Sequence, residues 1–376
     1  MKFSKYIPVL LFFFAAILLS GCAATRISST PVGPPNLQDT SKYAYVKVFY
    51  GTDRGYEKKI EKKKGKIIYT ASRTSEIKYG TCEVYIPKEM PKEYVYPTFW
   101  RLDFLEEPTH LMVLSKIDQV DKKTFYDELS SEVLKTPEKK AFLFIHGFNM
   151  SFDNAAKRTA QIAYHLGSDV VPIFYSWPSM GNIVGYLADE DSVEWTRPQL
   201  KAFLDDVATY SGAKTIYLMA HSMGNRALSK AVMSSNNSND KKILSTSYSS
   251  IMMAAPDIDQ DVFKRDIAPV LKLTGASITI YTSANDNALK ASSGLHNDKR
   301  VGEIIGSPIL IDGIETVDVS GIDSSFTGHG YYFNSDPFLN DLAQIIKGGK
   351  GASLRPNLQP VTSGGIERYW KLLNVK

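Results

Sequence analysis

The chain has 376 residues, of which 43% are hydrophobic and 22% are charged. This composition is that of an ordinary globular protein, and it excludes a disordered or fibrous chain. The formal charge of +4 falls to +2 without residues 1–21, which hold Lys2 and Lys5 and no acid, and such a balanced chain is not expected to bind nucleic acid.

The N-terminus has the layout of a secretion signal. Two lysines precede an apolar run over residues 7–19, and this run is too short to span a membrane comfortably. It ends in Leu-Ser-Gly-Cys at residues 19–22, which resembles the bacterial lipobox, a signal for cleavage before the cysteine and its lipidation. We therefore expect a signal peptide over residues 1–21 and a lipid anchor on Cys22 in an envelope membrane. In a Gram-negative cell, Ala23 favours the outer membrane, because aspartate at that position is the residue that retains lipoproteins in the inner membrane.

Residues 22–42 are rich in Ser, Thr, Pro and Gly, and we expect a flexible tether there. Strands are expected over residues 43–50, 82–86 and 111–117. The first two strands are separated by a segment with six clustered lysines: Lys58, Lys59, Lys62, Lys63, Lys64 and Lys66. The cluster is either a solvated loop or hairpin tip, or a contact with anionic lipid headgroups.

From residue 141 onward, apolar strands alternate with helical segments. Strands are expected over 141–145, 170–175, 215–220, 251–254, 278–281 and 316–319, and helices over 154–166, 192–210, 224–234, 262–273 and 337–346. This alternation predicts a mostly parallel sheet with helices on both faces. We expect one α/β domain over residues 43–347, with an N-terminal β extension, and an irregular tail with several Gly and Pro residues over 348–376.

Ser222 lies between a predicted strand and a predicted helix, which is the context of a nucleophile elbow. The turn needs small residues two positions to either side of the serine, because strand and helix approach each other closely. Here they are Ala220 and Gly224, and Ala220 departs from the usual G-x-S-x-G pattern by one methyl group. A serine that caps the helix is the alternative interpretation.

A serine nucleophile needs a base, and the chain has six histidines. With such an elbow the acid and then the histidine follow the serine in the chain, so only His296 and His329 come late enough. His329 lies between two glycines beyond the last predicted strand, where a loop can lean over the sheet edge. We expect His329 to be the base and keep His296 as the alternative.

The acid is expected after a strand beyond Ser222. Asp286 follows the second such strand, and Asp257 and Asp259 follow the first. We expect Asp286 to be the acid; Asp257 is the alternative, with capping of the next helix as its structural role. The acid would hold the imidazole tautomer and stabilise the imidazolium without taking the proton itself.

A His-Gly pair at residues 146 and 147 follows a predicted strand well before the elbow. An oxyanion hole at this position would take one backbone N–H from Phe148 and one from Met223. His146 then has an architectural role. No Cys, His or carboxylate cluster has metal-ligand spacing, so we expect neither a metal nor another cofactor.

Several phrases of the sequence occur together. They are Tyr-Gly-Thr-Asp-Arg at 50–54, Tyr-Gly-Thr-Cys-Glu-Val-Tyr-Ile-Pro at 79–87, Phe-Tyr-Ser-Trp-Pro at 174–178, Ala-His-Ser-Met-Gly-Asn-Arg at 220–226 and Ala-Ala-Pro-Asp-Ile-Asp at 254–259. Together they resemble an uncharacterised bacterial branch of the α/β-hydrolase superfamily of esterases and lipases, over roughly residues 45–335. The resemblance implies the α/β-hydrolase fold and a serine-hydrolase mechanism. It also matches Asp286 and His329 to the acid and base positions of the family.

The leading hypothesis is a serine hydrolase that cleaves a small-molecule or lipid ester and contacts the membrane through Cys22. The alternatives are a peptidase or acyltransferase with the same triad, and a non-catalytic binding lipoprotein on the same scaffold. Residues 176–198 either shape an acyl pocket or lid, or pack against the sheet. Asp53 and Arg54 could pair structurally near a strand end, and nothing in the sequence assigns them to catalysis. The sequence predicts nothing about oligomeric state.

Overall fold

A computed structural model describes residues 41–61, 64–88, 112–167, 169–182, 185–236, 248–322, 329–330, 335–349, 351–363 and 366–374. The predicted signal peptide, Cys22 and residues 22–40 of the predicted tether lie outside these described residues. In the described part of the chain, no helix is long and apolar enough to cross a membrane.

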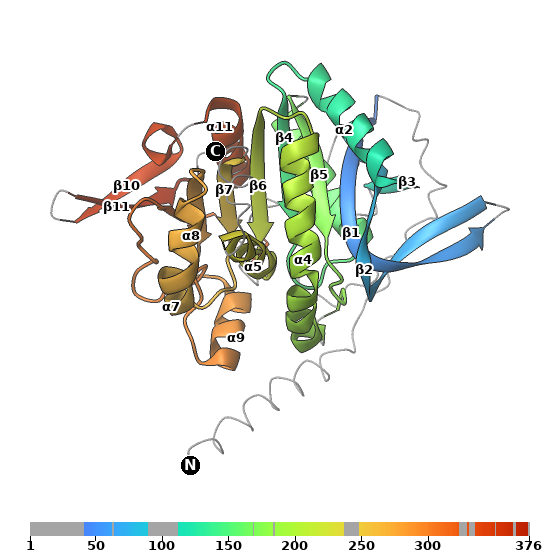
Figure 1. Cartoon of the computed structure of the whole chain (residues 1–376). Coiled ribbons are helices and arrows are strands. Elements are labelled where there is room, and N and C mark those ends of the chain that lie inside the picture. Colours follow the sequence, from blue (N-terminus) through green and yellow to red (C-terminus); the bar gives the residue numbers. More distant parts are fainter. Residues whose placement is uncertain are drawn as a thin grey trace, which may run out of the picture. The chain divides into compact units, whose positions relative to one another are not determined.

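The strands are β1 (Tyr43–Glu61), β2 (Lys64–Pro87), β3 (Val113–Val120), β4 (Lys140–Ile145), β5 (Val170–Ser176), β6 (Thr215–His221), β7 (Tyr248–Ala254), β8 (Ser277–Thr282), β9 (Glu315–Asp318), β10 (Leu358–Ser363) and β11 (Ile366–Leu372). They form one sheet in the order β10-β11-β9-β8-β7-β6-β4-β5-β1-β2-β3 (Figure 1). The strands from β9 to β1 run parallel to their neighbours, whereas β1, β2 and β3 are antiparallel. Every residue of β4 and β5 is buried, as expected for parallel strands covered on both faces.

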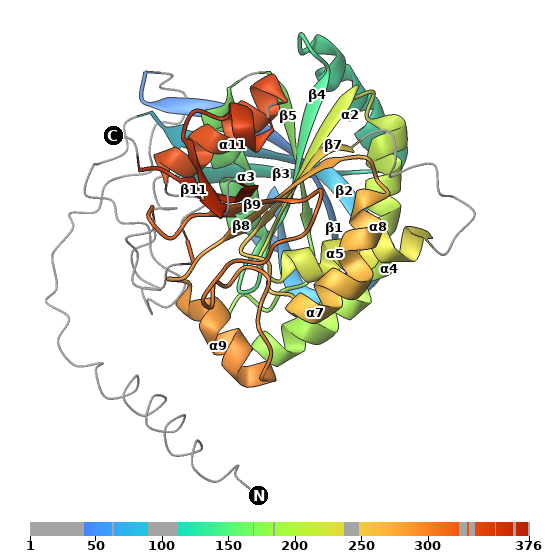
Figure 2. The ribbon, with the colours of Figure 1, turned by 90° about the vertical axis from the view of Figure 1, so that its left-hand side faces the viewer.

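Helices cover the sheet on both faces. One hydrophobic core packs α2 (Lys122–Lys135), α4 (Tyr186–Tyr210), α5 (Gly224–Asn236) and α8 (Ala268–Lys272) against the sheet, and a second packs α3 (Phe152–Leu166) and α11 (Asp336–Gly348). Figure 2 shows these two helix layers on opposite sides of the strands. The predicted mostly parallel α/β-hydrolase fold with an N-terminal β extension is therefore confirmed.

The predicted helix over 262–273 is made of three short pieces: α7 (Gln260–Val262), the π-helical η4 (Phe263–Ile267) and α8. Two further helices lie where the sequence analysis expects none. These are α2, which begins after the capping side chain of Asp121, and α9 (Asn287–His296).

The N-terminal extension is a long hairpin of β1 and β2, much longer than the two predicted strands. Its pairing continues to Glu61 and Lys64, so Lys58, Lys59, Lys64 and Lys66 lie on the two strands near the end of a hairpin that projects from the sheet (Figure 1). Lys62 and Lys63 of the cluster lie outside the described residues. The register shifts between Thr52 and Arg54, and again between Arg54 and Tyr56. Such bulges bend a strand and re-aim its side chains, and here they occur where β1 ends its pairing with β5.

The prediction of an irregular tail over 348–376 is wrong. After the short 3-10 helix η5 (Ala352–Leu354), β10 and β11 form a hairpin whose β11 pairs in parallel with β9. Trp370 and Leu372 are buried in the second core, and Arg355 forms ion pairs of 2.7 Å with both Asp341 and Glu315. The tail belongs to the same compact unit as the rest of Thr40–Lys376. It adds apolar side chains to the second core, and Arg355 neutralises the carboxylates of Asp341 and Glu315.

Candidate active site

Ser222 occupies the turn between β6 and α5. Its backbone has φ +48°, in the left-handed region that costs a non-glycine residue free energy and marks strained functional turns. Two hydrogen bonds hold the turn: Ser222 N–H donates to Ala254 O (2.9 Å) and Asn225 N–H donates to Ser222 O (3.0 Å). A Cβ atom on Gly224 would collide with the carbonyl oxygen of His146, so glycine is required there, while the extra methyl of Ala220 fits in the buried core.

Asp286 and His329 lie in contact at the same edge of the sheet. His329 Nδ1 and Asp286 Oδ2 are 2.6 Å apart, and both side chains are buried. The other carboxylate oxygen, Asp286 Oδ1, accepts the N–H of Leu289 at 2.9 Å, because Asp286 is the N-cap of α9. The carboxylate is thus fixed by a helix end on one side and presents its second oxygen to the imidazole.

The imidazole of His329 lies beside the elbow. Its ring centroid is 4.8 Å from that of His221, the residue before Ser222. Ser222, Asp286 and His329 are therefore gathered at the carboxyl ends of β6 and β8 and the loop that follows β9, although more than a hundred residues separate the first and last of them.

The predicted oxyanion residues also flank the elbow. A Cβ atom on Gly147 would come within 2.6 Å of His221 Nδ1 and 3.0 Å of Ser222 Cβ, so the loop before Phe148 packs directly on the serine. Met223 immediately precedes the first residue of α5, and its N–H belongs to the positive end of that helix. Both peptide groups thus lie in the segments that border Ser222.

His146 is built into the core. Its ring stacks on Trp177 at 5.1 Å between centroids, and Trp177 Nε1–H donates to His146 O at 2.7 Å. Burial, together with the charge of Arg54, lowers the pKa of His146 to about 3, so the ring is neutral at physiological pH. This environment fits the architectural role expected for His146.

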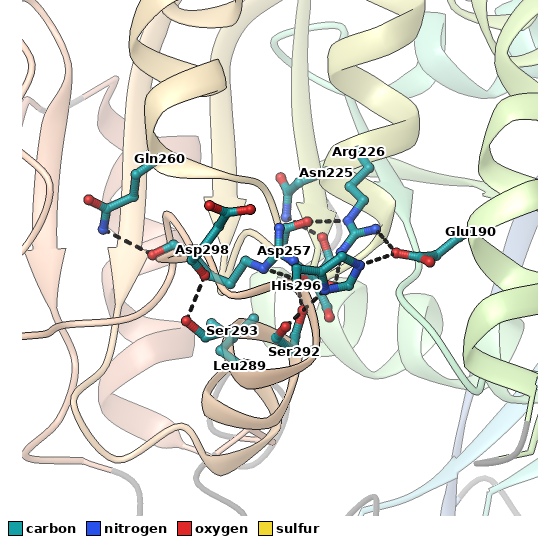
Figure 3. Close-up of polar contacts among 12 residues, drawn as sticks. Glu190, Asn225, Arg226, Asp257, Gln260, Leu289, Ser292, Ser293, His296 and Asp298 are labelled. Carbon is teal, nitrogen blue, oxygen red and sulfur yellow. Dashed lines mark hydrogen bonds and ion pairs between the residues drawn. The ribbon is translucent and has the colours of Figure 1, made fainter. Parts of the chain in front are cut away.

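The alternative acid and base lie in a different cluster (Figure 3). Asp257 accepts hydrogen bonds from Tyr186 Oη (2.8 Å), Ser292 Oγ (2.6 Å) and Arg226 Nη2 (2.9 Å). His296 bonds Glu190 Oε1 at 2.7 Å through Nε2, and its Nδ1 lies 2.9 Å from Ser292 O.

Arg226 lies between Asp257 and Glu190 and binds both (Figure 3). In the contacts that the structure describes, Asp257 and His296 share this network of α4, α5 and α9, and His329 is not part of it. The helix that follows β7 is capped by Asp259, so the capping role that was expected for Asp257 falls to its neighbour.

The described residues of the segment 176–198 pack against the sheet and against the loop that carries Phe148. Trp177 is fully buried, whereas Leu187 is 64% exposed and Trp195 is 39% exposed. The ring of Tyr186 meets Phe148 edge-on at 5.2 Å. Tyr186 thus contacts Phe148, the predicted oxyanion residue. The sequence leaves open whether this segment shapes a pocket or packs, because its aromatic residues carry no local signal that distinguishes the two.

The described residues contain no group of three or more His, Cys, Asp and Glu side chains arranged to hold a metal ion. The groups gathered around Ser222 are its own hydroxyl, an imidazole, a carboxylate and the backbone amides of the two bordering segments. These are the groups used in acyl transfer through a serine nucleophile.

A family model described as "Alpha/beta hydrolase of unknown function (DUF900)" matches residues 121–347. The match spans more than half of the chain and includes Ser222, Asp286 and His329. The chain belongs to this family. The match confirms the resemblance to an uncharacterised α/β-hydrolase branch, and the DUF900 chain is accordingly an α/β hydrolase.

Solved structures add weak similarities. A lipase-esterase related protein from Clostridium acetobutylicum is 10% identical, with a TM-score of 0.31, over 57% of the DUF900 chain and 94% of its own. An inhibited esterase B from Lactobacillus rhamnosis is 11% identical, with a TM-score of 0.29, over 66% and 74% of the two chains. A search of curated proteins gave no match.

Proposed function

We propose that this DUF900 chain is a serine hydrolase that cleaves carboxylic esters through an acyl-enzyme intermediate. The observation that carries the proposal is the 2.6 Å contact of His329 Nδ1 with the buried Asp286 carboxylate, beside a serine on a left-handed elbow. A carboxylate can only accept at this contact, so Nδ1 carries the proton and Nε2 of His329 is left as the base.

Acylation uses each of these groups in turn. Ser222 Oγ attacks the carbonyl carbon of the ester while its proton passes to Nε2 of His329, and Asp286 stabilises the resulting imidazolium. The carbonyl oxygen becomes negative and is stabilised by the N–H groups of Phe148 and Met223. The tetrahedral intermediate then breaks the bond to the leaving alcohol, which takes the proton from His329. A water molecule repeats the sequence on the acyl-enzyme, so that an acid is released and Ser222 regains its proton.

A fluorophosphonate probe tests the proposal directly, because it reacts covalently with an activated serine. We expect the wild-type protein to be labelled stoichiometrically and Ser222→Ala to be unlabelled, with circular dichroism showing that both are folded. Absence of labelling on folded wild-type protein would overturn the enzyme assignment and favour a non-catalytic binding protein on this fold.

The class of bond cleaved is tested separately, with matched ester, amide and thioester substrates that carry the same acyl group. We expect turnover of esters, because an alkoxide leaves more readily than an amide anion and places less demand on the acid. Preferential amide cleavage would assign a peptidase. Transfer of the acyl group to an added alcohol in preference to water would assign an acyltransferase.

We further propose that the enzyme acts on small-molecule or lipid esters at an envelope membrane, anchored by acylated Cys22. The sequence Leu-Ser-Gly-Cys after an apolar run supports this location. Several acyl chains on one cysteine each contribute roughly 0.8 kcal/mol of membrane binding per buried CH₂. Such an anchor would hold the hydrolase domain close to the membrane and to lipid esters within it.

A further inference from the structure

Arg54 ends the motif Tyr-Gly-Thr-Asp-Arg at residues 50–54, and it has no role in the proposed catalytic mechanism. Its side chain is 2% exposed, although a buried guanidinium loses its hydration. Burial lowers the pKa of Arg54 to about 10, so the group still carries its charge at neutral pH. The bulges of β1 at this residue turn the guanidinium toward the carboxyl ends of β4 and β5.

The guanidinium is bound by four oxygen acceptors from three segments: β2, the loop after β4, and the end of β5 with the turn that follows it. Arg54 Nε donates to Ser176 Oγ (2.8 Å), Nη1 donates to Thr70 O (3.2 Å) and Ser179 O (2.9 Å), and Nη2 donates to Met150 O (2.7 Å). Three are backbone carbonyls and one is a hydroxyl. The charges of Arg54 and Asp53 interact, but the guanidinium donates its hydrogen bonds to Ser176 and to backbone carbonyls, so Arg54 holds loop backbone in place.

One of these contacts leads to the oxyanion loop through a directed chain of hydrogen bonds. His146 Nδ1 lies 2.8 Å from Gly147 O, which can only accept, so the proton of the neutral ring is on Nδ1. His146 Nε2 must then accept from Ser176 Oγ at 3.1 Å, and Ser176 Oγ accepts from Arg54 Nε. The donor order is Arg54 to Ser176 to His146 to Gly147 O.

The last acceptor of this chain decides the orientation of a candidate oxyanion donor. Gly147 C=O and Phe148 N–H belong to one planar trans peptide group, so they point in opposite directions. A hydrogen bond into Gly147 O fixes the plane and aims the Phe148 N–H away from His146. It also polarises the peptide, which strengthens the N–H as a donor.

The far end of the same loop is held directly. Met150 O accepts from Arg54 Nη2, and Met150 N–H donates to Ser179 Oγ at 3.2 Å, which in turn donates to the buried carboxylate of Asp189 at 2.6 Å. Between the two held ends lies Asn149, at φ +54°, a conformation that a short loop keeps only when its surroundings fix it.

We propose that Arg54 is a positioning residue that holds the loop over residues 146–150 at both ends and so aims the Phe148 N–H into the oxyanion hole. The inference rests on the proposed serine-hydrolase function. Arg54 does not touch the substrate, and it acts through Ser176, His146 and Met150.

Arg54→Lys is the first test, because it keeps the charge and loses the fork that reaches both loop ends. We expect kcat for an ester substrate to fall roughly 10²-fold, approaching the loss on removal of an oxyanion donor, with KM changed less than about threefold. The Ki of a trifluoromethyl ketone, whose serine adduct carries an oxyanion, should rise by the same factor as kcat/KM falls. Titration with a fluorophosphonate gives the concentration of active sites, so misfolded protein does not imitate this result.

Ser176→Ala is a milder test that breaks only the chain to His146, and a roughly tenfold loss of kcat is expected, in keeping with the net strength of one hydrogen bond to a charged group. The matched control is Arg73→Lys. Arg73 lies opposite Arg54 across the hairpin and bonds Ser192 Oγ and Ala188 O of α4, away from the loop. It should leave kcat, KM and Ki unchanged.

A readout that needs no turnover separates this inference from the proposed function. With ¹⁵N-phenylalanine in the full chain, the Phe148 amide resonance should shift in Arg54→Lys and Ser176→Ala and stay in place in Arg73→Lys. An active wild type with unchanged kcat, Ki and Phe148 resonance in both variants overturns the positioning role alone. A wild type without esterase activity overturns the proposed function, and the Phe148 resonance then decides the loop-holding role by itself.

Discussion

Local backbone features position Ser222 and pair Asp286 with His329. The elbow gives Ser222 its strained φ, and the N-cap role of Asp286 leaves one carboxylate oxygen for the imidazole. We expect Ser222→Ala and His329→Ala to be nearly inactive, because each removes covalent acyl transfer, and Asp286→Asn to lose on the order of 10⁴ in rate. Their kcat/KM for an ester substrate, measured on folded protein, checks this order.

The double variant Ser222→Ala/His329→Ala should be little worse than either single variant, because the two residues act as a unit. If Asp286→Asn keeps its activity, or if His296→Ala is the dead variant, the acid and base are not the residues proposed.

Asp53 makes a separate prediction about pH. Its carboxylate is fully buried, and burial raises its pKa to about 6, above the ordinary value near 4. A raised carboxyl pKa means that the folded state binds the proton more tightly, so stability falls as pH rises from about 4 to about 6 and stays lower above that. Asp53→Asn should therefore increase the free energy of unfolding at pH 7 by roughly 2–3 kcal/mol.

Urea unfolding of the wild type and Asp53→Asn at several pH values measures this difference. It should disappear below about pH 4, where the aspartic acid is protonated in both the folded and unfolded states. A difference that does not depend on pH would mean that a lost contact, not the buried charge, is the cause.

Among individual residues, the sequence predicts those roles that the order of residues along the chain can reveal. The order serine, acid, histidine leaves His296 and His329 as bases and Asp257 and Asp286 as acids, and the structure brings Asp286 and His329 into contact. The role of Arg54 is not predictable in the same way, because its acceptors at Thr70, Met150, Ser176 and Ser179 meet only when β1 lies beside β5. Proximity that arises from strand pairing leaves no pattern at short sequence spacing.

Among the elements, α4, α5 and α9 are joined by the buried network around Asp257. Burial opposes ionisation of Asp257, but the charges of Arg226 and Arg300 outweigh it and the pKa of Asp257 is lowered. Asp257→Asn removes the carboxylate that faces the buried Arg300 and leaves Arg226 with the Glu190 carboxylate, and we expect it to reduce the free energy of unfolding by roughly 3 kcal/mol. The contribution of a lowered carboxyl pKa is present above about pH 4 and is lost as pH falls below it.

Urea unfolding at pH 7 and pH 3 checks this, with Asp266→Asn as the control, because Asp266 pairs with an exposed arginine. The folded fraction of Asp257→Asn should keep far more activity than Asp286→Asn, since Asp257 does not contact His329, and His296→Ala should be close to wild type. Loss of turnover in a fully folded Asp257→Asn would assign the acid to Asp257.

The elements that the sequence did not predict have physical reasons. In α2, Phe125, Leu129 and Val133 are buried at helical spacing behind the Asp121 cap, so the sequence does carry a helical signal there. In α9, only Leu289 and Ser292 are buried, which leaves hardly any apolar pattern. Pro360 in β10 argues against a central strand, but β10 is the edge strand of the sheet, where proline is tolerated.

The C-terminal hairpin makes the second element-scale prediction. Deletion of residues 351–376 removes Trp370 and Leu372 from the core, exposes the edge of β9, and leaves Asp341 buried without Arg355. We expect a large fall in melting temperature or insoluble protein. Deletion of residues 374–376 alone, beyond β11, is the control and should be neutral. A soluble, active protein that ends at residue 350 would show that the tail is dispensable.

For the whole molecule, the question is whether Cys22 anchors the hydrolase domain to a membrane. Stable anchoring needs more than one acyl chain, which a triacylated lipoprotein cysteine supplies. We expect wild-type protein to incorporate labelled palmitate and to sediment with membranes. Cys22→Ser should lose the label, and it should either be released from the membrane or retain residues 1–21. Cys82→Ser is the matched control. Cys82 is buried in the core, so its substitution should leave the palmitate label on Cys22 in place.

The same experiment separates anchoring from catalysis. Cys22→Ser should keep its kcat/KM for a soluble ester, because Cys22 precedes the tether and contributes no group to the proposed mechanism, but it should lose activity on esters presented in vesicles. In a Gram-negative host, Ala23→Asp should move the labelled protein from the outer to the inner membrane. Palmitate incorporation into Cys22→Ser at the wild-type level would contradict the anchor, and it would leave the serine-hydrolase proposal to stand on the triad alone.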